Sequence, residues 1–114
     1  MGCHYQEKYT VPFYESDINF NMKLPELLSL VLQVSGKQSM ALGISNEFIY
    51  EKYQLVWIVT DYAIEIERLP KYAETITVET VPTSYNKLFC YRDFYVYDAT
   101  GAKIITIHST FVLM

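Results

Sequence analysis

The chain has 114 residues, the usual size of one domain with a single hydrophobic core. Hydrophobic residues make up 51% of it and charged residues 19%, which excludes an intrinsically disordered segment. The net charge is −4, so we expect no nucleic-acid partner, because phosphate binding depends on clustered Lys and Arg. No stretch approaches the roughly 20 apolar residues of a membrane span.

The two cysteines, Cys3 and Cys90, lie far apart in the sequence. No Cys-x-x-Cys or Cys-His spacing occurs, so we expect no metal, no redox pair and no cofactor. A reduced, cytoplasmic protein is the simplest interpretation.

The first predicted strand covers residues 5–14, where Tyr9, Val11 and Phe13 alternate with polar positions. Pro12 favours an edge position for this strand, because proline cannot donate a backbone hydrogen bond to a neighbour. A polar stretch over residues 15–21 then interrupts the pattern with turn-forming side chains.

A helix is predicted from residue 25 to residue 42. Pro25 suits a first helical position, where its missing N–H is no loss, and Gly43 is a typical stop. The apolar residues recur at steps of three and four and cover more than one stripe: Leu24, Leu27, Leu28, Val31, Leu32 and Val34. We therefore expect other structure to wrap this helix.

Four further strands are predicted, at residues 55–67, 74–82, 87–97 and 102–114. The turn at residues 98–101 makes a tight hairpin between the last two. One strand, one helix and four long strands form an α+β order and not an alternating βαβ one. A long antiparallel five-stranded sheet wrapped around one central helix buries that helix and one face of every strand.

That order is the hotdog arrangement, and several segments carry a resemblance to a known family. They are Tyr14–Asp17, Arg68–Thr80, Phe89–Phe94, Asp98, Gly101 and Ser109–Met114. Together they resemble the acyl-ACP thioesterase family of bacteria and plants. The resemblance implies hydrolysis of the thioester between a fatty acyl chain and acyl carrier protein.

Residues 1–114 are expected to form a single hotdog domain, the amino-terminal half of a double-hotdog protein. The closing residues 111–114 are apolar and lack a polar tail, which indicates a chain cut at the end of a strand. The resemblance implies that the reacting groups lie in the second domain, in an Asp-x-Asn-x-His pattern. We expect this chain alone to be inactive.

The loop before the helix matches part of that pattern. Asp17 and Asn19 stand where its Asp and Asn do, but Asn21 replaces the His. An amide cannot act as a general base, so a degenerate site is expected. Asp17, Asn19 and His108, which could pair with Asp17, remain weak catalytic candidates. An ordinary turn or cap before a helix explains the first two without any chemistry, and a solvated strand histidine explains the third.

The resemblance also places the pocket for the acyl chain in this first domain. The candidates are apolar residues of the helix and of the strand after it, which an ordinary core explains as well: Leu28, Val31, Val34, Met40, Trp57, Ile58 and Val59. Scattered cations are candidates to meet the acidic carrier protein, unless they are simply solvated: Lys23, Lys37, Arg68, Lys71, Lys87 and Arg92.

Two functions follow. The first is the substrate-binding half of an acyl-ACP thioesterase, whose partners are acyl carrier protein and a second hotdog domain. The alternative is a stand-alone hotdog domain, either a homodimeric acyl-CoA thioesterase or a non-catalytic acyl-binding module. Hydrolysis by the isolated chain distinguishes them.

Overall fold

A computed structural model describes residues 4–41, 51–55, 57–85 and 89–114, with the backbone alone for residues 39–41, 57 and 85. The main elements follow the predicted order: β1 (Tyr5–Thr10), α1 (Leu24–Ala41), β2 (Trp57–Ile66), β3 (Thr75–Tyr85), β4 (Phe89–Tyr97) and β5 (Lys103–Leu113). A short 3-10 helix, Phe13–Glu15, lies between β1 and α1.

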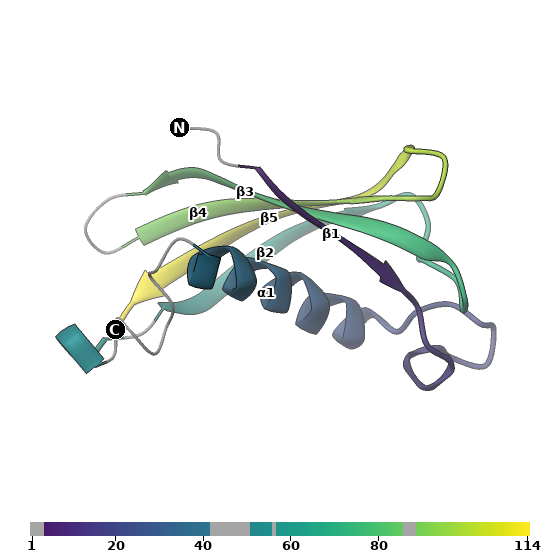
Figure 1. Ribbon diagram of the computed structural model, residues 1–114, viewed down its shortest axis with the longest axis horizontal. Helices are drawn as coiled ribbons and strands as arrows, with labels where there is room; N and C mark the ends of the chain where they lie inside the picture. Colours follow the sequence, from purple (N-terminus) through teal and green to yellow (C-terminus); the bar gives the residue numbers. More distant parts are fainter. Residues whose placement is uncertain (1–3, 42–50, 56, 86–88) are drawn as a thin grey trace.

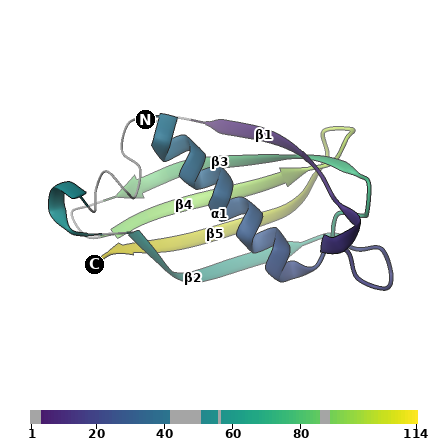
Figure 2. The same cartoon turned by 60° about the horizontal axis from the view of Figure 1, so that its bottom comes forward.

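The five strands form one antiparallel sheet in the order β1-β3-β4-β5-β2. The sheet curves, and α1 crosses its concave face diagonally (Figures 1 and 2). This arrangement confirms the predicted α+β hotdog fold. β1 and β2 are the two edges, and β2, with 10 residues, is longer than β1, with 6.

The core lies between α1 and the concave face. Alternation along each strand turns every second side chain toward the helix, and steps of three and four along α1 turn its apolar residues toward the sheet. The buried hydrophobic residues are Val11, Met22, Leu27, Leu30, Val31, Val34, Ile76, Val78, Phe94, Val96, Ile104, Ile105 and Ile107.

The predicted bounds agree with the structure to within a few residues, except at the first strand. That strand was predicted to reach residue 14, but β1 ends at Thr10 and Phe13 begins a 3-10 turn. The chain leaves the sheet at Pro12, which cannot donate to a neighbour. The predicted helix stop, Gly43, lies outside the described residues.

Ion pairs fix the end of the sheet that holds the β4–β5 hairpin. Arg68 donates two hydrogen bonds to Glu74, at 2.9 and 2.5 Å, and its guanidinium lies 3.5 Å from Asp98. Asp98 in turn accepts the N–H groups of Thr100 and Ala102. The loop between β2 and β3 is thereby tied to the hairpin.

The pair between Arg68 and Glu74 makes stability depend on pH. The hydrogen bonds from Arg68 lower the pKa of Glu74 below its ordinary value of 4.5. A depressed pKa contributes stability above the unfolded-state value, and this contribution is lost as the pH falls through the folded-state pKa. Because Arg68 is 39% exposed, solvent screening keeps the contribution small.

We expect Glu74→Gln to lower the free energy of unfolding at neutral pH by about 1 kcal/mol. The difference from the wild type should shrink as the pH falls below the ordinary value of 4.5. Urea unfolding across this range measures both effects. Glu65→Gln, at an exposed position of β2, is the control. A constant difference at every pH would show that the ion pair is not its source.

Candidate functional site

The loop before α1 is a turn closed by Asp17. Its Oδ1 accepts the backbone N–H groups of Asn19 at 2.8 Å and Asn21 at 3.0 Å. The Asp17 N–H donates to the carbonyl of Asn21 at 2.8 Å, and Phe20 takes a positive φ of 64°. These bonds are those of an Asx-type turn, the structural interpretation of Asp17. Asp17 and Asn19 are both exposed.

His108 lies on the outer face of the sheet. Its neighbours Ile107 and Ser109 are buried, whereas His108 is exposed and points away from α1. Its Nδ1 lies 2.7 Å from Asp93 Oδ1, and the Tyr95 hydroxyl donates to the other oxygen of Asp93 at 3.1 Å. The partner of His108 is therefore Asp93 and not the candidate Asp17, so the three weak catalytic candidates do not form one site.

The acyl-site candidates fall into two groups. Val31 and Val34 are buried on the sheet-facing side of α1, and Leu28 packs against the same core. Val59 is half-buried and points toward the helix side, but its neighbour Ile58 is 43% exposed on the opposite face. The structure does not bring Ile58 to the others. The side chains of Met40 and Trp57 lie outside the described residues.

A row of apolar side chains crosses the concave face beside the helix. Val59 on β2 is paired with Phe111 on β5, which is paired with Cys90 on β4. All three are half-buried. Burial raises the pKa of the Cys90 thiol, although a hydrogen bond with Arg92 acts in the opposite direction, so the thiol stays protonated near neutral pH.

The next row across the same face is polar. Tyr62 on β2 is paired with Ser109 on β5, which is paired with Arg92 on β4. Ser109 donates to the Arg92 carbonyl at 2.8 Å, and burial raises the pKa of the Tyr62 hydroxyl. Arg92 was one of the candidate cations for the carrier protein, but the structure turns its guanidinium toward α1, where it donates to Gln38.

The polar partners of Arg92 were not predicted from the sequence, although one signal was present. Gln38 stands four residues after Val34 and seven after Val31, so helical spacing places it on the buried side. It is 3% exposed.

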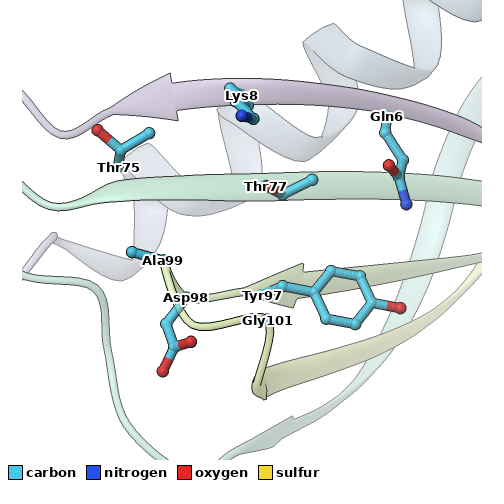
Figure 3. A pocket seen from close by; sticks show the side chains of 8 residues that line it. All are labelled: Gln6, Lys8, Thr75, Thr77, Tyr97, Asp98, Ala99 and Gly101. Atoms are coloured by element: carbon cyan, nitrogen blue, oxygen red, sulfur yellow. The ribbon is translucent and has the colours of Figure 1, made fainter.

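A separate hollow lies on the outer face, beside the β4–β5 hairpin (Figure 3). Its volume is about 400 Å³, and its lining residues are Gln6, Lys8, Thr75, Thr77, Tyr97, Asp98, Ala99 and Gly101. None of the acyl-site candidates lines it. Burial, together with a hydrogen bond to Glu79, raises the pKa of Tyr97 to about 12, so this hydroxyl stays neutral.

The remaining predicted cations differ in their pairing. Lys37 contacts Glu7 at 2.6 Å, and Arg68 is paired as described above. Lys23 and Lys71 are exposed near the loop before α1, where Asn21 pairs with Lys71. Lys87 lies outside the described residues.

In the described residues, no cluster of three or more His, Cys, Asp or Glu is arranged to hold a metal ion. No helix among them has the length and apolarity needed to cross a membrane.

Comparison with known proteins identifies the family. The acyl-ACP thioesterase N-terminal domain matches residues 2–114. The chain is 29% identical to the chloroplastic oleoyl-acyl carrier protein thioesterase of Coriandrum sativum, covering 99% of this chain and 32% of that protein. The chain therefore belongs to the acyl-ACP thioesterase family, and corresponds to its N-terminal domain.

Solved structures agree. A chain from Lactobacillus plantarum, assigned as an oleoyl thioesterase, superposes with a TM-score of 0.94 at 34% identity, covering 99% of this chain and 43% of that one. The 12:0-ACP thioesterase from Umbellularia californica superposes with a TM-score of 0.85 at 20% identity. The match covers 97% of this chain and 42% of that one. The chain thus spans about a third of the plant relative and under half of each solved chain.

Proposed function

We propose that this chain is the N-terminal, substrate-binding half of an enzyme that hydrolyses fatty acyl-ACP. In that reaction, water attacks the thioester carbonyl and releases a free fatty acid and the carrier thiol. The observation that carries the proposal is the family match over residues 2–114. In addition, the loop before α1 has no side chain free to act as a general base. Asn21 cannot take a proton from water, and Asp17 is engaged in closing its own turn.

The acyl chain would lie against the apolar part of the concave face. Leu28 on α1 and Val59 and Phe111 on the sheet are half-buried and offer apolar surface, and Val31 and Val34 are buried on the same side of α1. Such a continuous apolar wall suits a methylene chain. Met40 and Trp57 remain proposed members of this site, and the exposed Ile58 is left out.

A second hotdog domain would supply the groups that activate water. β2 is the long edge of the sheet, and it carries exposed apolar side chains at Ile58 and Ile66. An exposed edge strand with apolar side chains is a template for pairing. We therefore place the second domain along β2.

The acidic carrier protein would approach the end of the domain that holds the loop before α1. Lys23 and Lys71 are exposed there and would steer it electrostatically. The sequence predicts a cytoplasmic location, whereas the plant relatives are chloroplastic.

The test compares the chain alone with the chain joined to the C-terminal domain that we propose follows Met114. We expect no appreciable acyl-ACP hydrolysis by the chain alone and restored turnover with the second domain, which supplies the base. Liberated carrier thiol measures both rates, and Asp17→Ala in the joined protein is the control that should leave turnover nearly unchanged.

The same assay tests the alternative. Robust hydrolysis of acyl-CoA by the chain alone, lost in Asp17→Ala, would establish a stand-alone homodimeric thioesterase and refute the half-domain proposal. Binding of fatty acids without hydrolysis, even with a second domain present, would indicate an acyl-binding module.

A further inference from the structure

The hollow beside the β4–β5 hairpin lies on the outer face of the sheet, away from α1 (Figure 3). The register sets a row of three side chains across it: Lys8 on β1 is paired with Thr77 on β3, which is paired with Tyr97 on β4. Ile76 and Val78, on either side of Thr77 in the chain, are buried toward α1, so alternation turns this row outward. With a volume of about 400 Å³, the hollow has room for a small molecule.

A buried carboxylate fixes one wall of the hollow. The side chain of Glu79 is 9% exposed, and it accepts the Tyr97 hydroxyl at 2.8 Å and the Gln6 amide at 3.2 Å. His4 Nδ1 lies 2.8 Å from the same oxygen that accepts from Gln6. Both oxygens of Glu79 are therefore engaged, and the side chains of Tyr97 and Gln6 are held in place.

The hairpin forms another wall and is held as firmly. Asp98 accepts the N–H groups of Thr100 and Ala102, and it lies 3.5 Å from the Arg68 guanidinium. Figure 3 shows the Asp98 carboxylate directed away from Lys8. Arg68 thus compensates the charge of Asp98, and this carboxylate does not neutralise the cation in the hollow.

Two polar groups of the hollow are left over. Among the residues that the structure describes, the Lys8 ammonium and the Thr77 hydroxyl have neither an ion-pair nor a side-chain hydrogen-bond partner. Glu7, the chain neighbour of Lys8, is paired with Lys37 on α1 instead. A cation and a hydroxyl donor, unengaged on paired strands between fixed walls, are pre-organised to bind an oxyanion.

We propose that this hollow binds a phosphate monoester, with the phosphate group on Lys8 and Thr77. A lysine ammonium and a threonine hydroxyl both donate to phosphate oxygens. The hollow is larger than an inorganic phosphate, so the organic part of the ligand fills the rest, against the Tyr97 ring and the hairpin. The site lies on the face opposite the proposed acyl site, so it goes beyond the proposed function and does not depend on it.

The test is a titration of the protein with glycerol 3-phosphate, inorganic phosphate and glycerol, followed by the NMR shifts of backbone amides. We expect saturable shifts at Thr77 and Gly101 with both phosphates and no shifts with glycerol. Glycerol 3-phosphate should bind about threefold or more tightly than inorganic phosphate, because its organic part adds contacts. Equal binding of the two would overturn the assignment to a monoester. Shifts with glycerol of the same size, or none with any compound, would overturn the site.

Variants locate the binding group. Lys8→Met should weaken binding of glycerol 3-phosphate about tenfold or more, because a charge-assisted hydrogen bond is lost, and Thr77→Val about threefold. Lys8→Arg keeps the charge and should retain binding. Lys8 is exposed, so these changes leave the core intact. Lys23→Met, which removes an exposed cation near the loop before α1, is the matched control and should bind as the wild type does. Equal weakening by Lys8→Met and Lys23→Met would show that binding follows net charge alone, and would overturn the inference.

Discussion

Replacing Phe94 by alanine is expected to lower the free energy of unfolding by about 3–5 kcal/mol. Among the side chains that the structure describes, Phe94 is the largest that is fully buried, with 0% exposure at the centre of the sheet. Its strand is paired on both sides, by β3 and by β5, so the backbone cannot close around the space that the ring leaves. Urea unfolding followed by circular dichroism measures the change.

Phe89→Ala is the matched control for this prediction. Phe89 begins the same strand but is 38% exposed, so its removal should cost clearly less than the loss of Phe94. Equal losses at the two positions would mean that the concave face is not the core of the domain.

The chain without a second domain is expected to self-associate along β2. Glu67 donates its N–H to Ile104 at 2.9 Å on the β5 side. N–H groups alternate sides along a strand, so those of Ile64 and Ile66 point to the unpaired side. An antiparallel copy of β2 would satisfy them and cover the exposed side chains of Ile58 and Ile66.

The double variant Ile58→Lys, Ile66→Lys should shift this dimer to monomer. Charges at a paired edge repel and must be desolvated, so we expect association to weaken about 100-fold or more. Sedimentation velocity over a concentration series measures it. Thr10→Lys, on the other edge strand, should leave association unchanged. If that control dissociates the dimer and the double variant does not, the pairing edge is β1.

The fold could be predicted from the sequence because its signals are local. Alternation of apolar and polar residues predicted the strands. Apolar residues at steps of three and four predicted the bounds of α1 to within one residue at each described end. Pro12 also predicted an edge, and β1 is an edge strand. The bound at residue 14 was wrong because Phe13 continues the alternation of Tyr9 and Val11 after the backbone has left the sheet at Pro12.

The site could be predicted only in part, because it depends on register between distant strands. The polar row exists because β4, β5 and β2 align Arg92, Ser109 and Tyr62, and no local pattern fixes that alignment. The partner of His108 is set in the same way, by its pairing with Asp93. A register shift between Val59 and Asp61 further alters which β2 side chains face the helix.

The turn at Asp17 has a consequence for protein engineering. Asn21→His would complete the residue pattern of a water-activating loop, yet the carboxylate meant to assist the new imidazole already holds the amides of Asn19 and Asn21. Recruiting that carboxylate would unravel the loop that carries the imidazole. A designer who wants a second reaction centre in this half must therefore rebuild the loop itself, rather than exchange one side chain.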